Sequence, residues 1–272
     1  MDLLAIVSSY FPSLSKSEQK VAQLILSNPD EIEDLSINQL AMMAGVGEST
    51  IVRFARKIGY AGYQDLKLAL TKYQATAEKR IANKENKDDN IVFEQYVDSL
   101  KETKSFLESN KIDRAVQFMN EARRIFIFAV GESGFIGMEL SNRLKRLGKN
   151  VEFVQDGQLQ SIYATTMDKK DVAFSISTSG NTNEVIINMS LAKSNGCKVI
   201  ALTNYLGSKI AEESDLSLIA SSKEFHSDAG SFASSINQLF IIDIIIRELV
   251  KQDPEKFHKL RMKRNQALVD HL

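Results

Sequence analysis

The stretch that decides the fold of the C-terminal half spans residues 172–194 and reads VAFSISTSGNTNEVIINMSLAKS. Residues 172–177 are mostly apolar, and a short apolar run bounded by a turn predicts a buried strand. A cluster of hydroxyl-bearing residues with a glycine follows it and predicts a loop. The segment after that cluster has a helical pattern. The stretch therefore predicts one strand–loop–helix unit of an α/β fold.

Four further segments carry the same strand pattern. They are short and rich in Val, Ile, Leu or Phe, and they span residues 125–130, 151–154, 198–203 and 216–220. Helical patterns lie between most of them, and strands that alternate with helices form parallel sheets covered on both faces. We therefore expect an α/β doubly wound parallel sheet in the C-terminal half.

Two loops of this expected sheet have the chemistry of a phosphate site. Doubly wound folds bind ligands at the carboxyl ends of their strands, and a helix N-terminus there favours an anion. One loop follows residue 177, and the other, residues 131–134, follows the first strand. The residues expected to bind phosphate are Gly131, Ser133, Ser177, Thr178, Ser179 and Thr182. For either loop alone, ordinary helix capping by Ser and Thr is the alternative.

The N-terminal part is predicted to be all-helical. Helical patterns cover residues 15–27, 36–44 and 48–58. Ser15 or Ser17 can cap the first of them, and Ser36 stands at the start of the second. Gly45-Val46-Gly47 interrupts the helical pattern between the second and the third of these segments. Two helices joined by such a tight turn indicate a helix-turn-helix.

The helix expected at residues 48–58 has a polar side suited to DNA. At about 100° per residue, Ile51, Phe54, Ala55 and Ile58 share its apolar side. The candidates for DNA contact on the other side are Ser49, Thr50, Arg53, Arg56 and Lys57. An arginine can present a bidentate fork to a guanine edge, while other cations meet phosphates. A solvated helix face is the alternative.

Length and composition set the wider limits. The 272 residues, 43% of them hydrophobic, suffice for two modest cores. The formal net charge of −1 gives no overall attraction to nucleic acid, so DNA binding has to rest on local charge. The single Cys197 cannot form an internal disulfide, and no secretory signal or membrane-spanning apolar run is evident. We therefore expect a cytoplasmic protein.

Other candidate sites have weaker support. The three histidines are too scattered to suggest a metal site, and the sequence lacks a dinucleotide fingerprint and a P-loop, so we expect no metal and no cofactor. Glu132, Glu224 and His226 are candidates for an effector wall. A solvated face is the favoured interpretation of the basic residues Lys256, Lys259, Arg261, Lys263 and Arg264.

Both halves of the chain resemble the RpiR family of bacterial regulators, which join an N-terminal helix-turn-helix to a sugar isomerase (SIS) domain. The N-terminal marks are SINQLA at residues 36–41, STIVRFARKIGY at 49–60 and GYQDLK at 62–67. The C-terminal marks are GESG at residues 131–134 and STSGNT at 177–182. The resemblance covers nearly the whole chain.

The resemblance implies a transcription regulator rather than an enzyme, with a double-stranded DNA operator and a phosphosugar effector. It also implies a homodimer or homotetramer built through the SIS domains. On this basis we expect a DNA-binding domain at residues 1–77, a linker and connecting helix at 78–110, a SIS domain at 111–250 and a C-terminal helix at 251–272.

Two positions depart from the family's pattern. Ser235 stands where relatives often carry Arg, and Gly47 stands where they commonly carry Ser. Without that hydroxyl, we expect Ser49 to take over the cap of its helix. One alternative function remains, a phosphosugar aldose–ketose isomerase that would use Glu224 or His226 for proton transfer.

Overall fold

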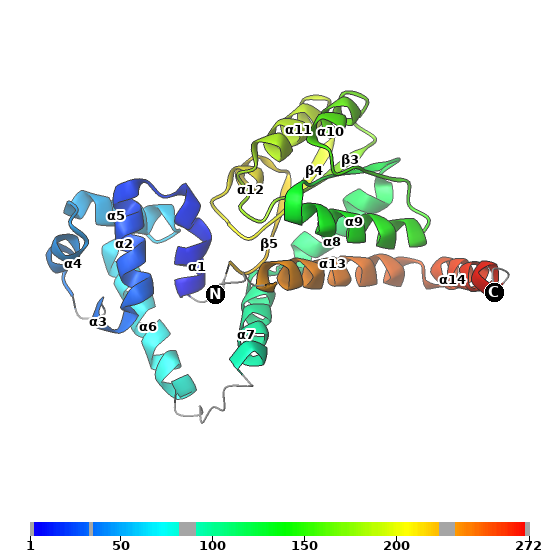
Figure 1. The fold of residues 1–272 in the computed structure, drawn as a ribbon. Helices are drawn as coiled ribbons and strands as arrows, with labels where there is room; N and C mark the ends of the chain where they lie inside the picture. Colours follow the sequence, from blue (N-terminus) through cyan, green and yellow to red (C-terminus); the bar gives the residue numbers. More distant parts are fainter. Residues whose placement is uncertain (1–2, 33–34, 82–90, 223–231, 270–272) are drawn as a thin grey trace.

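The structure is a computed structural model that describes residues 3–32, 35–81, 91–222 and 232–269 (Figure 1). Its N-terminal helices are α1 (Leu3–Tyr10), the 3₁₀ helix η1 (Phe11–Ser13), α2 (Lys16–Ser27), α3 (Pro29–Ile32), α4 (Ile37–Ala44), α5 (Glu48–Lys57) and α6 (Tyr63–Ile81). These helices enclose one apolar core in which Ile25, Ile51, Phe54 and Leu66 are fully buried.

Local sequence sets the ends of these helices, as predicted. Ser15 caps α2 in a capping box with Glu18, and Ser36 caps α4 in the same way with Gln39. Gly45 ends α4 with a φ of 62°, in the left-handed region that glycine adopts without a steric cost. The chain then turns directly into α5, which confirms the predicted helix-turn-helix.

The C-terminal part alternates helices and strands. Its elements are α7 (Ile91–Phe106), α8 (Ser109–Glu121), β1 (Ile125–Phe128), α9 (Gly131–Arg146), β2 (Val151–Phe153), α10 (Gly157–Thr165), β3 (Val172–Ile176), α11 (Asn183–Ser194), β4 (Lys198–Thr203), α12 (Lys209–Glu213), β5 (Leu216–Ile219), α13 (Ala233–Gln252) and α14 (Pro254–Val269). The strands lie where the sequence predicted them. They pair in parallel in the order β2-β1-β3-β4-β5, which confirms the doubly wound sheet.

Alternate residues of the central strands are buried on opposite faces of the sheet. In β1, Ile125 and Ile127 join the core beneath α8, α9 and α13. Phe126 and Phe128 join the core beneath α10, α11 and α12. Figure 1 shows these two helical layers on either side of the sheet. Burial on both faces explains why the strands are almost continuously apolar in the sequence.

The segment predicted to connect the two domains is largely helical where the structure describes it. α6 continues past residue 77 to Ile81, and α7 packs against α13. Ser99 Oγ of α7 donates to Asn237 Oδ1 at 3.2 Å, and Thr103 Oγ1 accepts from the Ser221 backbone N–H at 2.9 Å. α7 is therefore built into the C-terminal domain instead of serving as a free connector.

A buried carboxylate fixes the start of β3. The Asp171 side chain is fully buried and lies 2.8 Å from both Arg123 Nη2 and Arg124 Nη2. Although burial raises its pKa, hydrogen bonds from the Arg124 and Arg123 side chains lower the pKa of Asp171 to about 2. Both arginines immediately precede β1, so this cluster ties the start of β1 to the start of β3.

We expect Asp171→Asn to lower the free energy of unfolding at pH 7 by about 3 kcal/mol, because the pKa of an aspartate is about 4 in an unfolded chain. The folded-state pKa is depressed, so this stabilisation is complete above about pH 4 and is lost as the pH falls toward 2. Urea unfolding of both proteins across that range tests this. Asp168→Asn is the control, since the Asp168 side chain is 51% exposed. Equal losses in the two variants would contradict the prediction.

Candidate functional site

α5 presents a polar face on the outside of the N-terminal domain. Ser49, Arg53 and Arg56 are exposed on it, while Ile51 and Phe54 on the opposite side are fully buried. The Arg56 guanidinium donates to the Ala61 carbonyl at 3.4 Å, and this contact holds it beside the end of the helix. The exposed face therefore offers two guanidinium groups and one hydroxyl to a ligand.

Two residues predicted to lie on this face make contacts within the domain, and of the two only Lys57 is exposed. Thr50 is only 6% exposed, because it lies one turn before Phe54 on the core side of the helix. Its Oγ1 accepts a hydrogen bond from Arg53 Nη2 at 3.4 Å. Lys57 Nζ donates to the Ser13 carbonyl and pairs with Glu18 Oε2 at 3.6 Å. The predicted orientation of Thr50 is therefore wrong, and Lys57 holds α5 against η1 and α2.

The start of α5 also differs from the expectation. Gly47 is the N-cap residue, and among the described residues the structure has no side-chain hydrogen bond that caps α5. The predicted transfer of the cap to Ser49 is wrong, since Ser49 lies within the first turn and past the capping position. The N-terminus of α5 thus keeps backbone donors that a phosphate group can accept from.

The two hydroxyl loops meet where the connections of the sheet diverge. β1 and β3 are neighbours, but α9 leads away toward β2 while α11 leads away toward β4. Ligands of doubly wound folds bind at such a point. Here Ser133 Oγ, in the first turn of α9, lies 3.3 Å from Thr178 Oγ1 and accepts from the Thr178 backbone N–H at 3.3 Å. The topology therefore brings together two loops that are 45 residues apart in the sequence.

Ser177 organises the loop between β3 and α11. Its Oγ accepts from the Gly180 N–H at 3.0 Å and lies 2.8 Å from Thr182 Oγ1. Ser179 is exposed, and its Oγ accepts from the Asn181 N–H at 3.3 Å. The loop leads directly into α11, whose first turn leaves backbone N–H groups without helical acceptors. Hydroxyls and N–H groups thus converge on one curved loop, which is the donor set of a phosphate site.

Gly180 is required by this geometry. Its φ is 65°, and an added Cβ would lie 2.7 Å from Thr203 Oγ1 and closer still to Ser208 Oγ. Both of those side chains belong to the end of β4 and the loop after it. The loop after β3 is therefore packed directly on the loop after β4.

The remaining predicted residues of the site have mixed outcomes. Gly131 and Glu132 are exposed at the start of α9, and the Gly131 carbonyl accepts from Gln155 Nε2 at 2.8 Å. Glu132 thus lies in the first turn of α9, next to Ser133. Glu224 and His226 lie outside the described residues.

Two amide side chains at the site, those of Gln238 and Asn204, were not among the predicted site residues. Gln238 of α13 is fully buried, and its Nε2 donates to Thr178 Oγ1 at 3.1 Å and to Asn204 Oδ1 at 2.7 Å. Gln238 Oε1 has no hydrogen-bond partner among the described residues, although it is buried. The signal in the sequence was a pair of amides, Asn237-Gln238, at the start of the long apolar run of α13.

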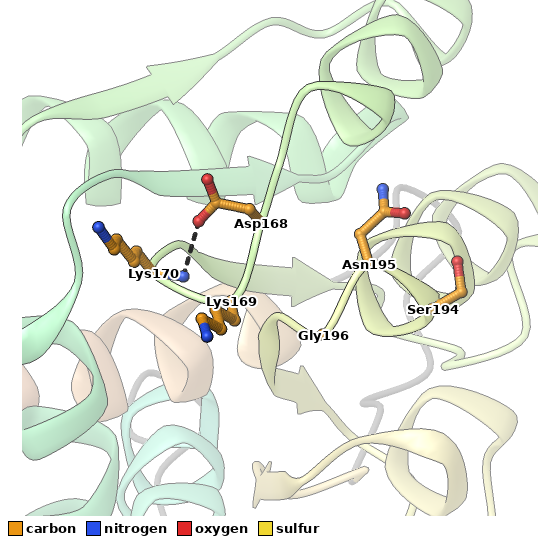
Figure 2. Close-up of a pocket in the computed structure, with 6 residues that line it drawn as sticks. All are labelled: Asp168, Lys169, Lys170, Ser194, Asn195 and Gly196. Carbon is orange, nitrogen blue, oxygen red and sulfur yellow. Dashed lines mark hydrogen bonds between the residues drawn. The ribbon is translucent and has the colours of Figure 1, made fainter.

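A shallow depression of about 530 Å³ lies at the opposite edge of the sheet, before β3 and β4 (Figure 2). It is lined by Asp168, Lys169, Lys170, Ser194, Asn195 and Gly196. Figure 2 shows Asp168 turned back onto its own loop, where it accepts from the Lys170 N–H. The depression is open and has none of the convergent donors of the hydroxyl loops, so it is not the candidate site.

Within the described ranges, no cluster of three or more His, Cys, Asp or Glu side chains has the form of a metal site. The same part of the chain contains no helix that is long and apolar enough to cross a membrane.

Each of the two domains matches a known protein family. Residues 1–77 match the family model "Helix-turn-helix domain, rpiR family", and residues 118–247 match the SIS domain. An uncharacterised HTH-type transcriptional regulator of Haemophilus influenzae is 31% identical over 271 residues, which cover 93% of this chain and 92% of that protein. The chain belongs to the RpiR family of transcriptional regulators.

Other relatives are similar over the same length. The regulator HexR of Escherichia coli is 30% identical, with 99% of this chain and 95% of HexR covered. The structure of Vibrio vulnificus NanR complexed with ManNAc-6P matches with a TM-score of 0.65 and 28% identity over 100% of this chain and 99% of that one. The sugar isomerase domain of an RpiR transcription factor from Sphaerobacter thermophilus shares the fold of 66% of this chain and 99% of its own, at a TM-score of 0.61 and 18% identity.

We expect Gly180→Ala to abolish the binding of sugar phosphates, because the new methyl group would displace Ser208 and Thr203 and the backbone would be strained as well. Thermal-shift titration with sugar phosphates measures the loss. Gly59→Ala is the matched control: Gly59 has a φ of 97° but no neighbouring atom within 4 Å of an added Cβ. That variant carries the strain without the clash, and it should keep the ligand-induced shift. Retention of the shift by Gly180→Ala would contradict the assignment of the loop.

Proposed function

We propose that this RpiR-family regulator of sugar metabolism binds operator DNA through α5 and that a sugar phosphate at the two hydroxyl loops modulates that binding. The observation that carries the proposal is the contact between Ser133 and Thr178, which joins two donor-rich loops in a chain that also has a helix-turn-helix. NanR of Vibrio vulnificus, similar in structure over the whole length, was solved with ManNAc-6P.

DNA contact is assigned to Ser49, Arg53 and Arg56. All three are exposed on α5, and the free N-terminus of this helix adds backbone donors for a phosphate. Arg53 is placed to read a base edge, because it lies in the N-terminal half of the helix, which enters the major groove in this motif. Arg56 lies near the helix end and is suited to the DNA backbone.

The effector site is assigned to the loops after β1 and β3. Ser133, Ser177, Thr178, Ser179 and Thr182 supply hydroxyls, and the first turns of α9 and α11 supply N–H groups. These hydroxyls now bond to one another, and each can instead donate to a phosphate oxygen. Gly131 leaves the entrance free of a side chain, and Glu132 is placed to accept from a sugar hydroxyl.

We further propose that the SIS domain senses the sugar phosphate without converting it. Its relatives of similar length are named transcriptional regulators. The hydroxyl and N–H groups assigned to the site are suited to hold a phosphate and not to act as a general base, and we assign Glu132, the carboxylate beside them, to a sugar hydroxyl. Interconversion of an aldose and a ketose phosphate by the purified protein, removed by Glu224→Gln, would overturn this part of the proposal. We also propose a cytoplasmic location, because a regulator of transcription works where the DNA is.

A homodimer or homotetramer completes the proposal. Several large apolar side chains are exposed on the outer helices of the SIS domain, namely Phe135 and Met138 of α9, Leu159 and Ile162 of α10, and Ile187 of α11. Side chains of this kind are typical of protein interfaces. A symmetric dimer would also place two copies of α5 on the two half-sites of an operator.

We expect sedimentation equilibrium to give at least twice the mass of one chain. Phe135→Asp combined with Ile162→Asp should shift the mass toward that of one chain, because a charge at either exposed apolar position opposes its burial in an interface. Lys251→Asp is a suitable control at an exposed position on α13. A wild-type protein that sediments as one chain would contradict the dimer.

The two sites should be separable by mutation. We expect Arg53→Ala to lower the affinity for a selected operator about tenfold or more, through loss of a bidentate base contact, and to leave the shift produced by sugar phosphate unchanged. Thr182→Val should lower the affinity for sugar phosphate about tenfold, since a hydrogen bond to a charged group is lost, and should leave DNA binding without effector unchanged. Electrophoretic mobility shift and thermal-shift titration measure the two affinities.

The controls are matched substitutions at positions away from both sites. Thr165→Val replaces an exposed threonine of α10, and Arg114→Ala replaces an arginine of α8. Both variants should behave like the wild type. Operator binding that survives Arg53→Ala would refute the assignment of α5.

A further inference from the structure

The loop between β4 and α12 lies against the DNA-binding domain. Gly207 of this loop has no room for a side chain, because an added Cβ would lie 2.8 Å from Tyr10 Cδ1 and closer still to Ser13 Oγ. The Gly207 N–H also faces the Ser9 carbonyl, at 3.4 Å. Ser9 is fully buried, so this surface of the N-terminal domain is closed by the contact.

Apolar packing extends the contact on both sides. Ala5 of α1 belongs to one buried cluster with Phe106 of α7 and Ile219 of β5. Leu206 and Ala211 pack against the same cluster. Burial, together with the carboxylate of Glu212 on α12, raises the pKa of Tyr10. α1 is thus packed into the SIS domain as well as into its own domain.

The same loop is bonded to the effector site. The Asn204 N–H donates to the Thr178 carbonyl at 3.1 Å, and the Ile210 N–H donates to the Gly180 carbonyl at 3.1 Å. Lys209 adds a third bond, from its N–H to Asn181 Oδ1 at 3.3 Å. Two of these are backbone-to-backbone bonds, so a shift of the hydroxyl loop carries the β4–α12 loop with it.

Ser13 completes the path to the DNA-binding helix. Its side chain meets Gly207, while its carbonyl accepts from Lys57 Nζ at the end of α5. Lys57 is held in place by Glu18 at 3.6 Å. One residue therefore touches both the loop that follows the effector site and the helix that faces DNA.

We infer that the contact of Gly207 with Tyr10 and Ser13, here called the α1 dock, couples the two sites, an inference that rests on the proposed function. We assign the closed dock to the effector-free state. Entry of a phosphate replaces the internal hydroxyl bonds of residues 177–182 and moves the loop, and the tight fit at Gly207 cannot absorb the movement, so the dock opens. The DNA-binding domain is then released from the position in which α1 held it.

Two variants open the dock from its two sides. Gly207→Ala wedges it open, and Tyr10→Ala removes the ring against which Gly207 packs, since an added Cβ at residue 207 lies 2.8 Å from Tyr10 Cδ1. Gly62→Ala is the matched control, because Gly62 has no atom within 4 Å of an added Cβ and no positive φ.

The measurement is the DNA affinity with and without sugar phosphate. The duplex is selected from random sequence by the wild-type protein. The probe is N-acetylmannosamine 6-phosphate, glucose 6-phosphate or fructose 6-phosphate, whichever gives the wild type the largest thermal shift. In the wild type we expect the two affinities to differ by about tenfold, within the usual range of coupling between two sites. By linkage, DNA must change the affinity for the sugar phosphate by the same factor.

Gly207→Ala should show the effector-bound DNA affinity at all times, and its ratio of affinities should fall to about one. Tyr10→Ala should behave in the same way, because it also removes the contact that holds the dock closed. Gly62→Ala should keep the wild-type ratio. If Gly207→Ala does not fold, Tyr10→Ala decides the question.

A wild-type ratio in both dock variants would overturn the inference while leaving the proposed function intact. A wild-type protein that binds no sugar phosphate, or no DNA, would instead overturn the proposed function. The two failures are therefore distinguishable in one set of titrations.

Discussion

The placement of β1 beside β3 is the constraint on which the rest of the structure depends. Because the two strands are parallel and their helices leave in opposite directions, the loops that follow them end at the same point of the sheet edge. The contact of Ser133 with Thr178 follows from that topology. At the other edge, Asp171 ties the starts of the same two strands together through Arg123 and Arg124. β1 and β3 are thus tied together at both ends, and the buried carboxylate of Asp171 joins the ends opposite the candidate site.

Much of the architecture could be predicted from the sequence, because local patterns determine it. The strands are apolar runs buried on both faces, and the capping residues Ser15 and Ser36 mark helix starts by their own side-chain chemistry. The hydroxyl loop after β3 was recognisable for the same reason. A strand end followed by Ser, Thr and Gly is a local signal.

The errors arose where a residue's environment is set by distant parts of the chain. Thr50 lies at the border between the two sides of α5, and the packing of Phe54 decides that it is buried. Lys57 reaches Glu18 and Ser13, which no pattern within α5 indicates. Gln238 meets Thr178 across 60 residues. Such pairs depend on tertiary packing, and the spacing of residues in one element does not reveal them.

The donors at the effector site have one further consequence, which concerns ionic strength. The side chains that form the hydrogen bonds of the hydroxyl loops, including Ser133, Ser177 and Gln238, are all uncharged. DNA binding through guanidinium groups weakens steeply as salt rises, because each neutralised phosphate releases counterions. A phosphate held by neutral dipoles in a partly buried loop is screened far less. With the effector site as proposed, a rise in salt would therefore weaken DNA binding far more than sugar-phosphate binding.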